Sequence, residues 1–154
     1  MSHVLIRPLE EKDALISYKW RNNPEVWKFT ANRPDQIITP EIESAWILKV
    51  LNENNSKRFA IITDQKYVGN IQITNIENFT AEYHIFIGNP EYWGKGIAFD
   101  ATIELFKYIQ SVLHLRSIYL FVNLYHEKAI VLYKRLGFEE ESHDNENIKM
   151  RKTF

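Results

Sequence analysis

Residues 92–98 read Tyr-Trp-Gly-Lys-Gly-Ile-Ala, and this short stretch decides how the rest of the sequence is interpreted. It follows an apolar segment and opens a run of helical periodicity, so it is expected to form a strand-to-helix turn. Gly94 and Gly96 let the backbone turn tightly and approach a ligand with no side chain in the way. The amides of this loop and of the first helical turn then form a site for a diphosphate, favoured by the helix dipole.

The loop is a weak signal by itself, because a Gly-x-Gly pair before a helix is equally compatible with a turn that binds nothing. The spacing excludes a Rossmann fingerprint, since Ala98 and Phe99 stand where the third glycine is needed. A Walker loop is excluded because no Gly-Lys-Ser/Thr is present. Lys95 either adds positive charge to the site or is simply a solvated lysine.

Periodic patterns on both sides of the loop predict a mixed α/β fold with helices on both faces of the sheet. The expected elements are a strand at 3–7, a helix at 10–21, a helix from 40 that ends at 52–56, strands at 59–63, 67–74 and 82–87, a helix at 97–113, a strand at 117–122, a helix at 128–136, and final strands near 138–140 and 148–151. The meander of three strands predicts antiparallel pairing. The crossover helix that follows it predicts one parallel pair.

Two helix ends carry specific signals. Thr39 is expected to cap the second helix and Pro40 to occupy its first position. The apolar face of that helix is predicted to contain Ile42, Ala45, Trp46 and Val50. Gly137 directly follows the helix expected at 128–136, where a residue in the left-handed conformation commonly ends a helix.

Composition limits the function classes. A chain of 154 residues fits a single domain, 1–154. A net charge of −1 gives no indication of binding to nucleic acid or to an acidic membrane. With no cysteine, thiolate metal sites and thiol nucleophiles are excluded, and no metal is expected. No signal peptide and no apolar run of about 20 residues is visible, so a cytoplasmic protein without a membrane partner is expected.

The loop resembles the acetyl-CoA-binding motif of the GNAT (GCN5-related N-acetyltransferase) superfamily, Gln/Arg-x-x-Gly-x-Gly/Ala. Trp93 stands at the Gln/Arg position, Gly96 at the glycine and Ala98 at the Gly/Ala position. Residues 128–138 independently resemble the family's Ala-Ile-x-Leu-Tyr-x-x-x-Gly-Phe helix and the strand after it. Two motifs at this separation are far more specific than either alone.

Other segments extend the resemblance over nearly the whole chain. Residues 20–26 are similar to the branch that contains ribosomal-protein and amino-sugar N-acetyltransferases, and residues 59–98 are similar to the spermidine acetyltransferases. The resemblance implies a GNAT-like fold, with a central mixed, mostly antiparallel sheet of about six to seven strands flanked by about four helices. It also implies acetyl-CoA as cofactor and transfer of its acetyl group to a primary amine of a small molecule or peptide in a ternary complex.

The cofactor-binding residues that the resemblance implies come from three segments. They are Phe86, Ile87, Gly88, Trp93, Gly94, Lys95, Gly96, Ile97, Ala98, Asn123, His126, Lys128 and Tyr133. Two positions depart from the family. Trp93 replaces the usual Gln/Arg, and His126 stands where the family often has an Asn that contacts the pantetheine arm. Asn123 could replace that contact.

Attack of a neutral amine on a thioester needs a base, a donor for the carbonyl oxygen and an acid for the leaving thiolate. The resemblance assigns the donor to the backbone amide of Ile87 or a neighbour and the acid to Tyr133, whose alternative role is packing on the sheet. Glu82 is the favoured base or water-positioning group, followed by His84. Period two places both on one strand face with Phe86, where they could also simply be solvated.

The acceptor side is the least determined. Arg21, Trp27, Phe29, Asn32 and Arg33 fall in the helix–loop region that covers the acceptor in the resembling families. Amino sugars, polyamines, antibiotics and protein N-termini are all possible acceptors. O-acetylation and transfer of a longer acyl group are alternative reactions, and a homodimer is a possible assembly. A different class of function is a non-catalytic acyl-CoA-binding or sensing domain, which would need neither Tyr133 nor a strand acid.

Overall fold

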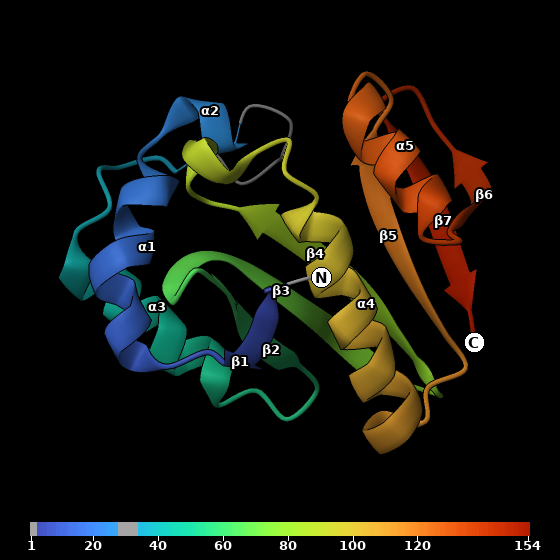
Figure 1. Ribbon diagram of the computed structural model, residues 1–154, viewed down its shortest axis with the longest axis horizontal. Helices are drawn as coiled ribbons and strands as arrows, with labels where there is room; N and C mark the ends of the chain where they lie inside the picture. The colour runs from blue at the N-terminus through green and yellow to red at the C-terminus, as the bar shows by residue number, and fades with distance from the viewer. Residues whose placement is uncertain (1–2, 28–33) are drawn as a thin grey trace.

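The computed structural model describes residues 3–27 and 34–154, whose strands form one sheet in the order β1-β2-β3-β4-β5-β7-β6 (Figure 1). The strands are β1 (Leu5–Pro8), β2 (Lys57–Thr63), β3 (Lys66–Glu77), β4 (Thr80–Ile87), β5 (Ser117–Asn123), β6 (Glu139–His143) and β7 (Asn147–Thr153). The α-helices are α1 (Ala14–Arg21), α2 (Pro24–Trp27), α3 (Pro40–Leu51), α4 (Ile97–Tyr108) and α5 (Glu127–Arg135). Short 3₁₀ turns cover Glu11–Asp13 and Pro90–Tyr92.

All neighbouring strands pair antiparallel except β4 and β5, which pair parallel. The parallel pair is joined by the crossover through α4, as the sequence predicts. The expected mixed, mostly antiparallel sheet is therefore confirmed.

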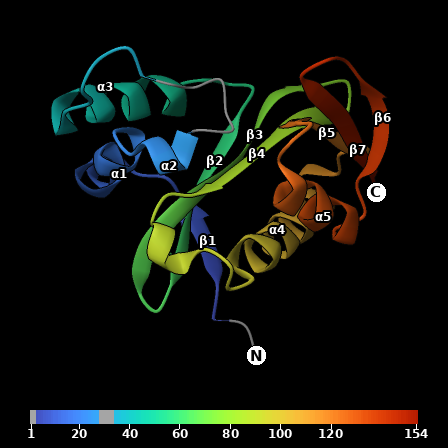
Figure 2. The ribbon, with the colours of Figure 1, turned by 90° about the horizontal axis from the view of Figure 1, so that it is seen from above.

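The sheet separates two layers of helices, with α4 and α5 on one face and α1, α2 and α3 on the other (Figure 2). Tyr83 and Leu105 belong to the larger core under α4, whereas Trp20, Ile47 and Tyr67 form the smaller core under α1 and α3. Tyr83 lies in the first core, but Phe86 packs against the second. This arrangement confirms the predicted alternation along β4.

The start of α3 confirms the predicted cap, because the Thr39 hydroxyl accepts a hydrogen bond from the Ile42 amide at 3.2 Å. The predicted buried face was wrong in part. The buried side chains of α3 are Glu43, Ile47 and Val50, whereas Ala45 is exposed. The face is rotated because Glu43 points inward to charged and polar partners on α1, which hydropathy periodicity does not detect.

Other differences concern element ends. The sequence ends the first helix at Arg21, as observed, but Pro24 then begins the additional helix α2, where a proline suits the first turn. The long helix expected over 97–113 keeps α-helical geometry to Tyr108 and continues as a π-helical turn over Ile109–Leu113. Gly137 has φ +97°, which confirms the left-handed cap after α5.

Two kinds of feature are absent from residues 3–27 and 34–154, a membrane-spanning helix and a cluster of metal ligands. No helix there combines the length and the apolar character needed to cross a bilayer. In the same part of the chain, no three His, Asp or Glu side chains gather as a group that could hold a metal ion.

Candidate active site

The site is built where β4 and β5 separate. Their parallel pairing covers only Thr80–Glu82 against Ser117–Tyr119, although β4 continues to Ile87 and β5 to Asn123. Figure 1 shows the two strands diverging from this common end. The second half of β4 therefore has a polar backbone edge that β5 does not pair with.

The pairing of β4 with β3 determines which groups face this gap. Gly88 donates its N–H to the Val68 carbonyl at 2.8 Å, so these two residues form a hydrogen-bonded pair. Ile87 lies opposite Gly69 in the same register and must form the alternating, non-hydrogen-bonded pair. The N–H and C=O of Ile87 consequently point away from β3, towards the gap. This orientation agrees with the predicted carbonyl-oxygen donor, which stays a prediction.

The Gly94–Gly96 loop has the geometry of an anion cradle. Gly94 and Gly96 have φ values of +74° and +77°, and a Cβ added at either would meet no heavy atom within 4 Å. The first hydrogen bond of α4 runs from the Asp100 amide to the Gly96 carbonyl at 3.1 Å. Within the part of the chain that the structure describes, the amides of residues 94–99 have no protein acceptor. Open donors at the start of a 12-residue helix fit the diphosphate of a coenzyme A derivative.

Other predicted cofactor residues have different environments. Lys95 is exposed, with its ammonium 5.5 Å from the centre of the Tyr92 ring, and Ile97 is buried in the core under α4. Gly88 serves packing, because an added Cβ would lie 2.0 Å from Cδ2 of Trp20. The absence of a side chain at Gly88 therefore lets α1 approach β4.

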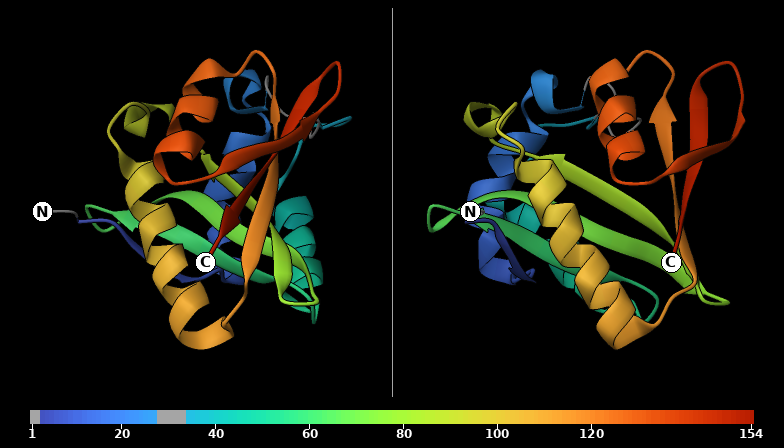
Figure 3. Two further views of the ribbon diagram at one scale, coloured as in Figure 1. Left: turned by 90° about the vertical axis from the view of Figure 1, so that its right-hand side faces the viewer. Right: turned by 45° about the vertical axis from the view of Figure 1, so that its right-hand side comes forward.

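The turn from β5 to α5 lies at the end of β5 remote from its pairing with β4 (Figure 3). Asn123 organises the turn, since its side-chain oxygen accepts from the Tyr125 amide at 2.8 Å and its carbonyl accepts from the His126 amide at 3.0 Å. Lys128 follows in the first turn of α5 and is exposed. Contacts of Asn123, His126 and Lys128 with a cofactor stay predictions.

Tyr133 of α5 lies on the α4 side of the sheet. Its ring packs edge-on against Tyr83 and Phe138, with centroid separations of 5.9 and 5.8 Å. Burial raises the pKa of its phenol to about 12. No described residue hydrogen-bonds its hydroxyl. The ring thus has the packing role considered from the sequence, and its hydroxyl stays protonated at neutral pH, without a hydrogen bond to any described residue.

Glu82 and His84 lie on the opposite face of β4. Nε2 of His84 is 3.3 Å from a carboxylate oxygen of Glu82 and 3.1 Å from the Thr74 hydroxyl, while Asn75 donates to the other Glu82 oxygen at 3.2 Å. Burial lowers the pKa of His84, and the charge of Arg58 lowers it further, against the opposing effect of Glu82. His84 is therefore neutral at pH 7 and able to accept a proton.

The predicted acceptor residues are only partly described. Arg21 is engaged within the fold, because its guanidinium donates to Glu43 at 2.7 Å. The Glu43 side chain is nearly inaccessible and also accepts from the Ser17 hydroxyl at 2.7 Å. Trp27 ends α2 and is half-buried. The remaining three residues of this set, Phe29, Asn32 and Arg33, lie outside the described residues.

Sequence reasoning missed three residues that shape the site. Trp20 packs on Gly88, while Thr74 and Asn75 hydrogen-bond His84 and Glu82. A glycine at the end of a strand does signal a close approach of other groups, but it does not identify the partner. Thr74 lies directly opposite Glu82 in the β3–β4 register, so only correct strand pairing could have found it.

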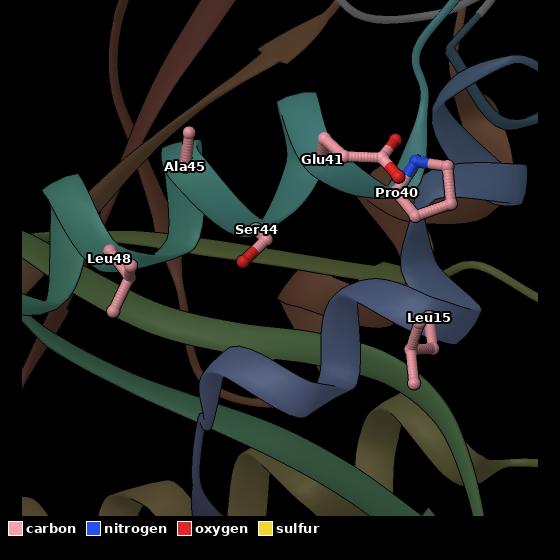
Figure 4. Close-up of a pocket in the computed structure, with 6 residues that line it drawn as sticks. All are labelled: Leu15, Pro40, Glu41, Ser44, Ala45 and Leu48. Carbon is pink, nitrogen blue, oxygen red and sulfur yellow. The ribbon is translucent and has the colours of Figure 1, made fainter.

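Two surface hollows lie away from this site. One, of about 390 Å³, lies between α1 and α3 and is lined by Leu15, Pro40, Glu41, Ser44, Ala45 and Leu48 (Figure 4). A second, of about 680 Å³, lies around β1 and the β2–β3 turn. Neither is lined by a residue predicted to bind cofactor or acceptor.

Comparison with known families gives a match over most of the chain. The family model described as "Acetyltransferase (GNAT) domain" matches residues 3–139. This range contains β1 to α5, and with them the Gly94–Gly96 loop and Tyr133.

Individual relatives agree with the family match. The chain is 32% identical over 140 residues to the spermidine N(1)-acetyltransferase of Escherichia coli K12, covering 90% of this chain and 74% of that protein. The crystal structure of spermidine N-acetyltransferase from Vibrio cholerae in complex with CoA and spermine has a TM-score of 0.87 at 25% identity, covering 99% of this chain and 96% of that chain. A dodecameric structure of the Vibrio cholerae enzyme has a TM-score of 0.81 at 25% identity, with coverages of 99% and 95%.

Proposed function

The chain belongs to the GNAT acetyltransferase family, and from that premise we propose that it acetylates a polyamine of the spermidine class. It is an acetyl-CoA-dependent N-acetyltransferase that acts on an amine. The proposal concerns the identity of the acceptor and the residues that carry the chemistry. It is supported by relatives named for spermidine acetylation and by a similar fold solved with CoA and spermine.

One observation carries the assignment of the chemistry. At the opening between β4 and β5, Tyr133 lies on one face of the sheet, and Glu82 and His84 lie on the other. A thioester in this gap would have its sulfur accessible to an acid from the α5 side. Its carbonyl carbon would be accessible to an amine from the α1 side. Acid and base are thus separated, so that each can act on a different reacting atom.

Acetyl-CoA, when bound, supplies a thioester whose acetyl group passes to the amine. The amide of Ile87 donates to the carbonyl oxygen as negative charge develops there. Glu82 or neutral His84 removes the proton of the ammonium, directly or through water, because an alkylamine has a pKa of about 10.4. After the nitrogen–carbon bond forms, the nitrogen loses its second proton to water. As the carbon–sulfur bond breaks, Tyr133 gives its proton to the sulfur and recovers one from solvent.

Carboxylates on the base side offer a partner for a cationic acceptor. Tyr119 lies beside Glu82 in the β4–β5 register. Burial raises the pKa of Tyr119, and the carboxylates of Glu82 and Glu77 raise it further, against the effect of Arg151. The carboxylates of Glu82 and Glu77 therefore contribute negative charge at this position, where an alkylammonium ion could pair with them, although Lys149 and Arg151 lie 4.8 and 5.3 Å from the centre of the Tyr119 ring.

A thiol-release assay with acetyl-CoA over a matched set of acceptors tests the proposal. We expect spermidine and spermine to give a kcat/KM at least about tenfold above an amino sugar, an aminoglycoside and a peptide N-terminus, the equivalent of about 1.4 kcal/mol. Mass spectrometry should show one added acetyl group on the polyamine. Efficient turnover of another acceptor, with none of the polyamines, would overturn the assignment. Cofactor binding without turnover of any acceptor would favour a sensing domain.

We also infer that the chain self-associates through the helical layer of α1 and α3. Leu15 and Leu48 are 65% and 44% exposed beside the hollow between these helices, and burial of such side chains against a second copy is favourable. A related enzyme has been solved as a dodecamer. Light scattering should give the mass of an oligomer, and Leu15→Lys should reduce it. A monomer at micromolar concentration would contradict the inference.

A further inference from the structure

We propose that Trp93 is a positioning residue, which joins the diphosphate loop to the part of β4 that receives the thioester carbonyl. The proposal rests on the placement of that carbonyl at the Ile87 amide, argued above. Nε1 of Trp93 donates to the Ile87 carbonyl at 2.7 Å. The side chain at the family's Gln/Arg position therefore bonds β4, and a cofactor contact is not its only available role.

The bond connects the end of β4 directly to the start of the glycine loop. Trp93 ends the 3₁₀ turn Pro90–Tyr92, where its own amide donates to the Pro90 carbonyl at 3.1 Å, and Gly94 follows it directly. Ile87 is the last residue of β4 and has no partner on β5. The indole thus spans from the beginning of the anion cradle to the unpaired edge of the strand.

The bond also completes the restraint of one peptide unit. The Ile87–Gly88 peptide has its carbonyl held by Trp93 and its N–H held by the Val68 carbonyl, while the ring of Trp20 lies against Gly88. The Ile87 carbonyl and the Gly88 N–H are both engaged, whereas the N–H of Ile87 still faces the gap. A donor fixed in advance stabilises developing charge without reorganisation during the reaction.

Loss of the bond should leave the fold intact. Trp93 is 40% exposed, so water can replace the indole N–H at the Ile87 carbonyl. The effect should therefore appear in turnover, because a mobile Ile87 amide is a poorer donor. It should not appear in global stability.

The experiment removes the N–H while retaining the ring. Trp93→Phe is the simple variant, and replacement of Trp93 by benzothienylalanine keeps the bicyclic shape without the donor. We expect kcat to fall about five- to tenfold, as for one lost hydrogen bond, with the calorimetric Kd for CoA within about threefold of wild type. Trp93→Gln, which restores a side-chain donor, should recover part of the loss.

Phe79→Leu is the control, because Phe79 is an exposed aromatic residue that precedes the start of β4, at the end of the strand remote from Ile87. It should keep wild-type kcat. Unchanged kcat in both Trp93 variants would overturn the proposal, as would a loss accounted for by weaker CoA binding alone. A wild-type protein that releases no thiol with any amine would instead contradict the proposed function, so the two failures are distinguishable.

Discussion

Gly88 and Trp20 are in direct contact, and a Cβ at Gly88 would lie 2.0 Å from Cδ2 and 2.2 Å from Cε3 of the indole. Trp20 is buried and also packs against Tyr67 and Phe86, with ring-centroid separations of 4.7 and 6.0 Å. The helix α1 therefore packs directly on the residue that follows β4, and the missing side chain at Gly88 sets how closely the two approach.

Gly88→Ala should destabilise the protein by about 1–3 kcal/mol, because the rigid indole must move to admit the methyl group. Chemical denaturation measures the loss. Trp20→Leu also destabilises by removing ring contacts, but in its background the added methyl group should have a much smaller effect. If the stability losses of the two single variants simply added in the double variant, the contact would be contradicted.

Gly96→Val should weaken acetyl-CoA binding by at least about tenfold, since a β-branched residue is strained at a positive φ and its side chain would project towards the anion. Isothermal titration calorimetry measures the change in Kd. Gly137→Val is the control, because Gly137 also has a positive φ but caps α5. It should lower stability and leave Kd near the wild-type value. Equal affinities for all three proteins would remove the loop from the cofactor site.

Tyr133→Phe should lower kcat by about 10²-fold, the usual contribution of a general acid, with little change in cofactor Kd. The ring contacts with Tyr83 and Phe138 are retained, and the hydroxyl has no hydrogen bond to a described residue, so stability should change by less than about 0.5 kcal/mol. Steady-state kinetics with a slow acceptor, where chemistry limits the rate, give the clearest comparison. Wild-type turnover there would leave Tyr133 with packing alone.

Tyr133 also has a predicted effect on stability at high pH. Its pKa is about 12 in the folded protein, above the ordinary value of 10. Deprotonation therefore favours the unfolded chain, and the contribution to stability is complete below pH 10 and is lost between pH 10 and 12. Tyr133→Phe should show a smaller decline in this window. An identical decline in both proteins would contradict the buried phenol.

Glu82→Gln distinguishes the two candidate bases through the acid limb of the pH–rate profile. The charge of Glu82 raises the pKa of His84 against the lowering effect of burial. If His84 is the base, loss of that charge should move the acid limb to lower pH. If Glu82 is the base, kcat should instead fall by about 10²-fold at all pH values. A profile unchanged in height and position would leave proton removal to water.

Protonation of His84 should also make the stability of the protein depend on pH in the acid range. Its folded pKa lies below the unfolded value of 6.5, so the unfolded chain binds the proton more readily. Stability then falls as the pH drops below about 6.5 and levels off once the folded pKa is passed. His84→Gln should show a smaller decrease in the same range in urea denaturation. The opposite trend would require a raised His84 pKa.

Local signals were sufficient for much of the fold. Strand alternation, the Thr39 cap and Gly137 each depend on a few neighbouring residues, so element order and the parallel pair across α4 could be predicted. The inward turn of Glu43 could not, because it depends on Ser17 and Arg21 from a distant helix. Likewise, α2 forms in a segment whose composition indicates only irregular structure.

The site shows the same division. Residue type and spacing along single segments were enough to indicate the family, the glycine loop and the candidates Tyr133, Glu82 and His84. The end of the β4–β5 pairing at Glu82, and the position of Tyr133 on the other face of the sheet from Glu82 and His84, follow from the tertiary fold alone. The tertiary fold also decided that Trp93 bonds Ile87 and Trp20 fills the space beside Gly88. These relations join residues from different elements, and the packing of helices on both faces of a twisted sheet determines them.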